Sequence, residues 1–462
     1  MKKFTAEEIA RAVAGELIQG DPRAGFTSVS TDTRTVGHGD LFVALAGEQF
    51  NAHDFIDKAL TGGAGGLMVS RRVETRSWPG PVIMVQDTLQ ALQFLARFNR
   101  KNFAGLIVAV TGSNGKTTTK DMTASVLGQK FVTLKTEGNM NNHIGLPLTL
   151  LKLDDSHGAA VLEMGMRGLG EIDLLAGIAL PDGAIITNIG ETHLERLGSV
   201  ANIARAKGEL LDHITEKGFA VLNGDDPLVR QQSARCRGRV IFYGTGGEAP
   251  VCAENISTAD GKGLVFTART PAGEIDVNLQ VPGRHNIHNA LAAAAVGLEA
   301  GLTTEEIRKG LEATKLTSMR LDITEGHKIT VINDTYNANP ASAKAALQIL
   351  ADVGKGRRKV AIMGDMYELG SRTAEGHREV GTAAAALGVD VLTAVGKIAE
   401  EIALGASLDD NPPNEIITFN TNAEVNRHLN KIIHAGDVVL VKGSRGMKME
   451  EIVAGLLELD KK

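Results

Sequence analysis

Short apolar runs recur along this chain, and most of them are followed by a helical pattern of apolar residues. In the middle of the chain these runs occupy residues 106–110, 159–164, 184–188 and 219–223. Such alternation predicts a mostly parallel sheet with crossover helices, in which ligands bind at the carboxyl ends of the strands. Residues 263–281 alternate between polar and apolar instead, which predicts an antiparallel addition to that sheet.

The same alternation occurs in separate blocks before and after this region. The first block has short apolar runs at 41–45, 66–69 and 82–85, together with many glycines. The last block has runs at 328–333, 359–363, 389–395 and 438–441, separated by helical patterns such as 341–350 and 373–386. A chain of 462 residues is also too long for one hydrophobic core. We therefore predict an α/β protein of three domains, at residues 1–86, 87–314 and 315–462.

Composition and charge exclude some classes of protein. The apolar fraction of 43% is that of an ordinary globular protein. The net charge of −6 comes from 49 basic and 55 acidic residues that are intermixed, so the sequence offers no basic face for nucleic acid. Cys236 and Cys252 have no CxxC spacing, and we interpret them as reduced thiols in a reducing compartment.

No membrane segment or signal peptide is predicted. No uncharged apolar run reaches the roughly 18 residues that a membrane helix needs. Residues 1–12 carry charges where a signal peptide requires an apolar stretch. We expect a cytoplasmic protein without membrane insertion.

The strongest local signal is a phosphate-binding loop at residues 111–118, between an apolar strand and a helix predicted at 117–127. Gly112 and Gly115 allow backbone N–H groups to turn inward toward a phosphate. Lys116 supplies a positive charge, the Thr117 hydroxyl can ligate Mg²⁺, and the helix directs its positive end at the same anion. A glycine turn alone could be structural, but this order of elements predicts ATP binding. The predicted residues are Thr111, Gly112, Ser113, Asn114, Gly115, Lys116, Thr117 and Thr118.

Three further side chains are candidates for the chemistry at the same sheet edge. Glu163 ends a strand and can hold Mg²⁺, although a solvated strand-end acid is an equal alternative. His193 follows the next strand, where a metal-phosphate site favours a ligand over a packing or surface histidine. Lys207 lies on a helix predicted at 201–213, and composition alone favours a solvent-facing lysine there.

Polar side chains also follow other elements. Asn286 and Asn289 share one face at the start of an alanine-rich helix; capping explains one of them, and two amides suit recognition of a planar base. Residues 333–342 form a loop after a strand, for which a plain turn with a helix cap at Ser342 is the alternative. Segments 364–370 and 442–446 end two further strands, and we expect all three loops to face one crevice.

Together these strings resemble the Mur ligase family over essentially the whole chain. Segments 29–34 and 39–45 resemble that family's uridine-nucleotide domain, and segment 136–147 is similar to its substrate-contacting segment. The resemblance implies a central ATPase domain with a phosphate loop, flanked by the N-terminal uridine-nucleotide domain and a Rossmann-like C-terminal domain. It also replaces the solvent-facing interpretation of Lys207, because its counterpart in the family is carbamylated by CO₂ and ligates a second Mg²⁺.

The resemblance further implies roles for individual residues. The residues expected at the UDP-linked substrate are Ser30, Thr31, Asp32, Arg34, Thr136, Asn139, Asn141 and Asn142. Arg320 and Asp334 join Asn286, Asn289 and the phosphate loop at ATP. The incoming D-alanyl-D-alanine is expected at Tyr336, Asn337, Asn339 and Ser444. The catalytic residues are Lys116, Glu163, His193 and Lys207, and the metal ligands are Thr117, Glu163, His193 and Lys207, for two Mg²⁺ ions.

The activity implied is ATP-dependent amide ligation in peptidoglycan precursor synthesis. UDP-N-acetylmuramoyl-tripeptide, ending in lysine or diaminopimelate, and D-alanyl-D-alanine would be the substrates, joined through an acyl phosphate. We expect a monomer. Two alternatives stay open: a related ligase such as a folylpolyglutamate synthase, which would not need the uridine-domain string, and a non-enzymatic nucleotide switch, which would not need the loops of the third domain.

Overall fold

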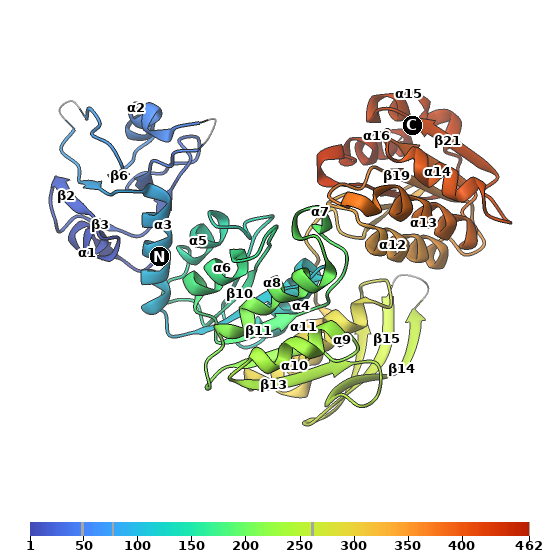
Figure 1. The fold of residues 1–462 in the computed structure, drawn as a ribbon, viewed down its shortest axis with the longest axis horizontal. Coiled ribbons are helices and arrows are strands. Elements are labelled where there is room, and N and C mark those ends of the chain that lie inside the picture. Colours follow the sequence, from blue (N-terminus) through green and yellow to red (C-terminus); the bar gives the residue numbers. More distant parts are fainter. Residues whose placement is uncertain (48–49, 76–77, 260–262, 462) are drawn as a thin grey trace.

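The structure, a computed structural model, describes residues 1–47, 50–75, 78–259 and 263–461. Its main sheets lie one after another along the chain, and helices cover them (Figure 1). This arrangement confirms the predicted α/β class. Within the described ranges, no helix combines the length and apolar character needed to cross a membrane.

The first sheet belongs to the N-terminal domain and has five strands in the order β2-β7-β6-β5-β4. Strands β4 (Val29–Ser30), β5 (Leu41–Val43), β6 (Gly66–Val69) and β7 (Val82–Met84) are parallel, and β2 (Glu16–Gln19) pairs antiparallel with β7. Helices α1 (Ala6–Ala12) and α2 (Ile56–Thr61) complete this domain. The three predicted strands are therefore confirmed.

The second sheet has nine strands in the order β16-β15-β14-β13-β12-β11-β8-β10-β9. The four predicted strands are confirmed as β8 (Leu106–Thr111), β10 (Ala159–Glu163), β11 (Gly183–Ile186) and β12 (Phe219–Asn223), and all pair in parallel. The predicted antiparallel addition is the hairpin of β15 (Gly263–Thr270) and β16 (Gly273–Leu279). Strands β9 (Thr133–Lys135), β13 (Arg239–Gly244) and β14 (Val251–Ala259) were not predicted. The apolar stretches of β9 and β14 are very short, whereas the apolar run 240–243 of β13 was overlooked.

Both faces of this second sheet are covered, which explains its continuous apolar strands. Alternate residues of β8 and β10 pack against α3 (Thr88–Lys101), α6 (Glu171–Ala179) and α8 (Val200–Asp212). The remaining residues pack against α4 (Lys116–Leu127), α10 (Asn286–Glu299) and α11 (Thr304–Glu312). The phosphate loop leaves β8 between these two layers.

The third sheet has six strands in the order β17-β18-β22-β19-β20-β21. Strands β18 (Thr330–Asp334), β22 (Val438–Lys442), β19 (Lys359–Gly364), β20 (Val391–Val395) and β21 (Glu415–Phe419) are parallel, and β17 (Asp322–Glu325) is antiparallel. Helices α12 (Pro340–Val353), α13 (Thr373–Ala386) and α14 (Glu400–Ser407) cover one face. Helices α15 (Asn422–Ile432) and α16 (Glu450–Lys461) cover the other.

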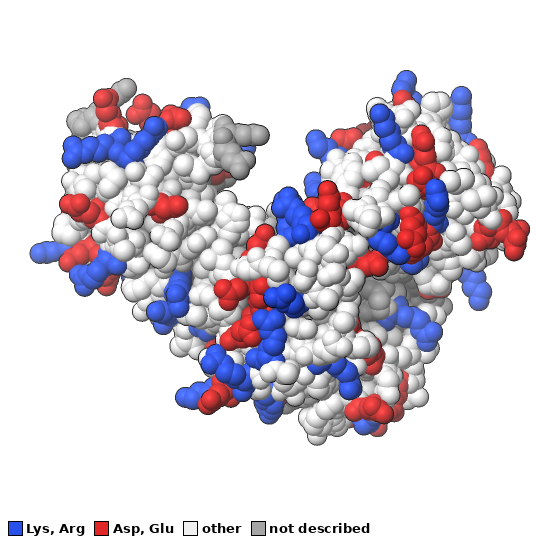
Figure 2. All heavy atoms as spheres, in the orientation of Figure 1, with Lys and Arg blue, Asp and Glu red and all other residues white. Residues whose placement is uncertain are grey.

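In the space-filling view, a wide notch separates the N-terminal domain from the third domain, with the central domain as its floor (Figure 2). Lys and Arg side chains are interspersed with Asp and Glu across this face. The view shows no continuous basic surface, in keeping with the net charge of −6.

Candidate active site

The phosphate loop has the backbone that its glycines allow. Gly112 has φ +150° and Gly115 has φ +80°, in a region that other residues rarely adopt. A Cβ on Gly112 would lie 1.9 Å from the Thr187 hydroxyl oxygen, and one on Gly115 would lie 2.6 Å from the Asn289 Oδ1 atom. Both positions therefore require glycine, for close approach as well as for conformation.

Residues after β11 hold this loop in place. The Asn188 side chain accepts a hydrogen bond from the Asn114 N–H (2.9 Å) and donates one to the Asn114 carbonyl (3.0 Å). The Thr187 hydroxyl donates to the same carbonyl at 2.6 Å, and the Ser113 N–H donates to the Asn188 carbonyl at 2.8 Å. The loop is thus fixed before any ligand binds. Asn188 was not among the predicted site residues; its place directly after an apolar strand was the only available signal.

Two lysines converge on one loop carbonyl. The Lys116 ammonium donates to the Gly112 carbonyl at 2.8 Å, and Lys207, on α8, donates to the same oxygen at 2.9 Å. Lys207 is only 2% exposed, so the solvent-facing alternative was wrong. Burial lowers the pKa of Lys207 well below its usual value, and the nearby charge of Lys116 lowers it further. Burial likewise lowers the pKa of Lys116. This environment favours a neutral amine on Lys207.

A buried carboxylate faces the first turn of α4. Glu163, 2% exposed, accepts a hydrogen bond from the Thr117 hydroxyl at 2.7 Å and one from the Asn141 amide at 2.7 Å. The solvated-acid alternative for Glu163 was therefore wrong. A hydroxyl and a carboxylate beside a phosphate loop are oxygen donors that suit Mg²⁺, which fills its other positions with water and phosphate oxygens. The residues present fit such an ion.

His193 has a different neighbour. Its Nδ1 atom lies 2.5 Å from the Glu368 Oε2 atom, which belongs to the third domain. Burial lowers the pKa of His193, against the opposing effect of Glu368, and the charges of Lys116 and Lys207 lower it further. Among the residues that the structure describes, no three His, Cys, Asp or Glu side chains gather as a metal site. The structure thus places Thr117, Glu163 and Lys207 around the loop, and it connects His193 to another domain.

The two asparagines of α10 are buried and already hydrogen-bonded within the protein. Asn289 accepts from the Thr119 hydroxyl (2.9 Å) and donates to Asn286 (2.8 Å), and Asn286 donates to the Pro282 carbonyl (2.6 Å). The two amides were expected to be available to a planar base. They instead form hydrogen bonds within the protein, and those of Asn289 connect α10 to the phosphate-loop helix α4. A direct base contact stays a prediction, and the internal hydrogen bonds speak against it.

The three predicted loops of the third domain lie together, because β18, β22 and β19 are adjacent. The Tyr367 N–H donates to the Ser444 hydroxyl oxygen at 2.8 Å, and the buried Lys442 ammonium pairs with Asp334 at 2.5 Å. Lys442 also donates to the Asn337 carbonyl at 2.8 Å. Asp334, expected at ATP, is therefore already paired with a cation.

Asn339 has two roles in the first of these loops. Its side chain caps α12 by accepting from the Ser342 N–H at 2.9 Å, and the Ser342 hydroxyl oxygen accepts from the Asn339 N–H at 3.0 Å. The cap is thus Asn339, and the alternative of a cap at Ser342 was wrong. The Asn339 amide also donates to the Asn114 Oδ1 atom of the phosphate loop at 2.7 Å. This contact joins a residue predicted at the dipeptide to one predicted at ATP.

Arg320 and Tyr336 form a pair at the start of the third domain. The guanidinium lies 4.0 Å from the centre of the Tyr336 ring. The Arg320 Nε atom is buried and finds no hydrogen-bond partner in the described part of the chain. Asn337, next to Tyr336, is exposed. A cationic side chain with unused donors is suited to an anion such as a phosphate.

The residues predicted at the UDP-linked substrate fall into two groups. Ser30, Thr31, Asp32 and Arg34 belong to the edge of the N-terminal sheet, where hydrogen bonds from Arg34 lower the pKa of Asp32 to about 2. Thr136, Asn139, Asn141 and Asn142 belong to the central domain. Thr136 is fully buried, and its hydroxyl oxygen accepts from the Glu163 N–H at 2.9 Å. Asn139 and Asn142 are exposed, and Asn142 accepts from the N–H groups of Ile144 and Gly145 at the start of α5 (Gly145–Leu150).

Comparison with known proteins adds the following. Residues 110–297 match the Mur ligase middle domain, and residues 319–445 match the Mur ligase glutamate ligase domain. UDP-N-acetylmuramoyl-tripeptide–D-alanyl-D-alanine ligases of Bacillus subtilis and Escherichia coli are each 39% identical, over 99% of this chain and 99% of theirs. A crystal structure of MurF from Acinetobacter baumannii superposes with a TM-score of 0.90, at 34% identity over 99% of both chains. MurF from Thermotoga maritima, in complex with ADP, superposes with a TM-score of 0.82, at 30% identity over 94% of this chain and 98% of that one.

Proposed function

This chain belongs to the Mur ligase family, and we propose that it joins D-alanyl-D-alanine to UDP-N-acetylmuramoyl-tripeptide with consumption of ATP. The relatives of this name from Bacillus subtilis and Escherichia coli match it over 99% of both chains. The observation that carries the chemistry is the buried contact between Thr117 and Glu163 beside Lys116 and Lys207. Such a reaction supplies a peptidoglycan precursor, and we propose a cytoplasmic location because ATP and UDP-linked substrates are available there.

The reaction has two steps. A carboxylate oxygen of the tripeptide attacks the γ-phosphorus of ATP, giving an acyl phosphate and ADP. The dipeptide amine then attacks the acyl carbon, and inorganic phosphate leaves with the bonding electrons as the amide forms. Positioning and charge neutralisation dominate the first step. In this chain, Lys116 and the backbone N–H groups of the first turn of α4 would hold the phosphates, while the Ser113 and Asn114 N–H groups fix the loop to Asn188.

Exclusion of water is the second requirement, because an acyl phosphate hydrolyses readily. Asn339 of the third domain contacts Asn114 of the phosphate loop at 2.7 Å. The incoming amine would therefore be held by Tyr336, Asn337, Asn339 and Ser444, on the domain that covers the ATP loop. Ser30 to Arg34 would hold the uridine end from the opposite side of the notch.

We also propose two Mg²⁺ sites. Thr117 and Glu163 would hold the first ion, whose charge would offset that of the phosphates. The second would use His193 and a carbamate formed on Lys207, since CO₂ reacts with a neutral amine and burial lowers the pKa of this lysine. Carbamylation converts a cation that repels the metal into an anion that attracts it.

Lys207 offers a direct test of the carbamate. Lys207→Ala should lose activity and regain part of it with a short carboxylic acid that fills the vacated space. Lys207→Arg should not be rescued, because it keeps a positive charge where a negative one is needed. Phosphate release from ATP is the measurement, and full activity of either variant without acid would contradict the proposal.

The overall reaction is tested by phosphate release with each UDP-muramoyl peptide, with and without D-alanyl-D-alanine. We expect turnover only with a tripeptide and the dipeptide together, and the lysine and diaminopimelate forms are compared side by side. A folylpolyglutamate synthase from Mycobacterium tuberculosis is 19% identical with a TM-score of 0.63, a likeness that concerns the fold alone. Turnover with a folate substrate, or ATP binding without any ligation, would overturn the proposal.

A further inference from the structure

The central and third domains meet at a polar seam, formed by residues 191–195 of the central domain and 368–372 of the third. The His193 Nδ1 atom lies 2.5 Å from the Glu368 Oε2 atom, and Arg372 forms an ion pair with Glu191 at 3.2 Å. A Cβ on Gly370 would lie 3.1 Å from the Cα atom of Glu195, so the two backbones also touch. Helix α7 (Leu194–Leu197) carries this contact toward the third domain (Figure 1).

The two residues at the centre of the seam have an uncommon backbone. His193 has φ +56° and Glu368 has φ +63°, although neither is glycine. This conformation costs free energy and persists where the surrounding structure holds it, often at functional sites. Both residues follow the carboxyl ends of parallel strands, β11 and β19. The central domain therefore positions His193 and the third domain positions Glu368, each after the end of one of its own strands.

The pairing decides which nitrogen of the imidazole carries the proton. An ionised carboxylate only accepts hydrogen bonds, so the Nδ1 atom that faces Glu368 must be the donor. The neutral ring then keeps its lone pair on Nε2, which is the atom available to a metal ion. Histidines that ligate metals commonly donate their other N–H to a carboxylate in this way.

We propose that Glu368 is a positioning residue that fixes the tautomer and orientation of His193 for the metal–nucleotide site. This rests on the proposed function, in which His193 is a metal ligand. Glu368 belongs to the third domain. Docking of that domain therefore fixes the orientation of the His193 imidazole in the ATP-binding domain. The domain that brings the amine thereby helps to complete the site that activates the carboxylate.

The ordinary explanation of this contact is a surface ion pair. The Glu368 side chain is 37% exposed and that of His193 is 25% exposed, and pairs of this kind add little stability. Such a pair would have no effect on the metal requirement. The distinguishing measurement is therefore the Mg²⁺ dependence of nucleotide binding, which requires no turnover.

The test uses the full chain with ADP as the probe, titrated by calorimetry over a range of Mg²⁺ concentrations. Glu368→Ala should raise the Mg²⁺ concentration required for half-maximal binding about tenfold, with Mg²⁺-free binding of ADP unchanged. Glu368→Gln, which keeps an acceptor without the charge, should have a smaller effect. The control is Glu401→Gln, because Glu401 pairs with Arg378 at 2.6 Å inside the third domain and neither residue belongs to the seam.

Two further measurements separate the possible failures. His193→Ala should raise the Mg²⁺ requirement, and adding Glu368→Ala to it should have no further effect. Nitrogen NMR of the histidine ring should show a proton on Nδ1 in the native chain and a mixture of tautomers in Glu368→Ala. Glu368 is overturned as a positioning residue if Glu368→Ala leaves the Mg²⁺ requirement unchanged or lowers it. The same holds if Glu368→Ala weakens ADP binding without Mg²⁺ as much as it weakens ADP binding with Mg²⁺. If His193→Ala itself leaves the requirement unchanged, the metal role of His193 fails, whereas the ligase assay tests the overall reaction separately.

Discussion

The central domain is joined to its two neighbours in opposite ways. At the N-terminal junction, one hydrophobic core continues across the boundary: Phe4, Ile9 and Met68 belong to the same cluster as Leu146 and Leu162. At the other junction, Leu316 of the linker packs against a central cluster, and beyond the linker no hydrophobic cluster of the described residues combines central and third-domain side chains. The contacts there include the polar seam, the Asn114–Asn339 hydrogen bond, the linker and a close approach of Gly283 to Ile349.

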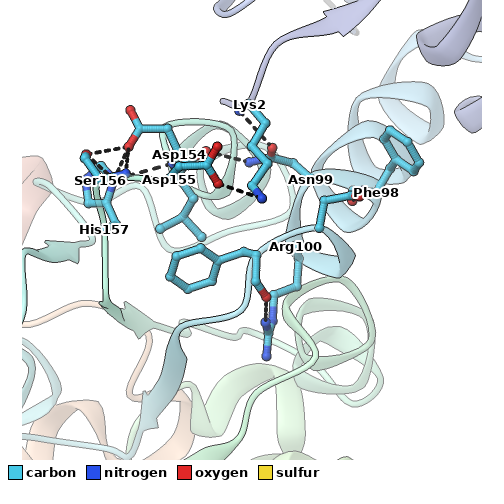
Figure 3. Close-up of polar contacts among 11 residues, drawn as sticks. Lys2, Phe98, Asn99, Arg100, Asp154, Asp155, Ser156 and His157 are labelled. Atoms are coloured by element: carbon cyan, nitrogen blue, oxygen red, sulfur yellow. Dashed lines mark hydrogen bonds and ion pairs between the residues drawn. The ribbon is translucent and has the colours of Figure 1, made fainter.

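Buried polar side chains of α3 reinforce the N-terminal junction (Figure 3). Asn99 donates to the carbonyls of Leu150 and Leu153 at 2.9 and 3.0 Å, and its oxygen accepts from the Lys2 N–H at 3.3 Å. The Lys2 ammonium pairs with Asp155 at 2.6 Å. Arg100, on the same helix, donates to several backbone carbonyls and to Asp182. The Lys2 contacts therefore cross the junction, whereas Arg100 fixes α3 within the central domain.

The linker to the third domain is held at its start and strained further on. Thr317 donates through its N–H and its hydroxyl to the buried Asp121 of α4, both at 2.8 Å. Met319 has φ +64° and Leu321 has φ +51°, which is unusual for such side chains. The Met319 carbonyl accepts from the Tyr336 N–H at 3.2 Å. The chain thus changes from one domain to the other within residues 318–321.

This difference predicts that the N-terminal domain stays fixed to the central domain and that the third domain can move relative to it. Separation of a shared apolar core costs about 25 cal/mol for each Å² exposed, so that junction stays closed. Polar contacts exchange with water at little net cost, so the third domain can leave and return without exposing a core. Domain closure around ATP and the amine is therefore expected at the seam.

The largest expected effect comes from removing a whole domain. A chain that ends after Thr314 should fold and bind nucleotide and UDP-tripeptide but form no amide, because the third domain keeps its own cores. A chain that begins at residue 87 should fail to fold, because it exposes the shared core. Circular dichroism, nucleotide binding and the ligase assay distinguish these outcomes. Amide formation by the first truncated chain would contradict the proposed role of the third domain. A stable fold of the second truncated chain would contradict the shared core at the N-terminal junction.

Lys116→Ala should lower kcat on the order of a hundredfold or more, because the lost charge interacts most strongly with the transition state. In the part of the chain that the structure describes, Lys116 contributes to neither junction, so the arrangement of the domains in solution should be the same in the variant as in the native chain. Steady-state kinetics and small-angle scattering are the measurements. Near-native turnover would remove Lys116 from the proposed mechanism.

Arg100→Met should destabilise the protein by about 3 kcal/mol, because buried carbonyls and Asp182 lose their donor. Arg97→Met, on the exposed face of the same helix, is the matched control and should have little effect. Thermal unfolding measures the difference, and kcat at low temperature should stay near the native value. Equal melting temperatures for the two variants would show that the attachment of α3 to the central domain does not depend on this arginine.

Arg372→Gln should change stability by about 1 kcal/mol or less, since its partners Glu191, Glu375 and Glu379 are partly exposed. It should instead loosen the third domain, which small-angle scattering detects as a larger radius of gyration in the absence of nucleotide. The control is Lys344→Gln, because Lys344 pairs with Glu379 inside the third domain. An unchanged radius would mean that the seam does not depend on this ion pair.

Much of the sheet architecture and several site residues could be predicted from local patterns. Apolar runs mark buried strands. The glycine-lysine-threonine order after β8 is tied to one loop conformation, so the phosphate loop was recognisable from the sequence alone. Strands such as β14, which is mostly polar and largely exposed over residues 254–258, gave no comparable signal. The role of Asn188 was equally hidden, because nothing near it in sequence shows that it faces Asn114.

The sequence by itself determined which side chains follow the strands, because that placement depends on neighbours along the chain. Only the tertiary structure decided their environment. Lys207 is buried because α8 packs against the phosphate loop, and Glu163 meets Thr117 because β10 lies beside β8. His193 meets Glu368 across 175 residues of sequence, in another domain. Contacts over such separations follow from the packing of whole domains, which no local pattern specifies.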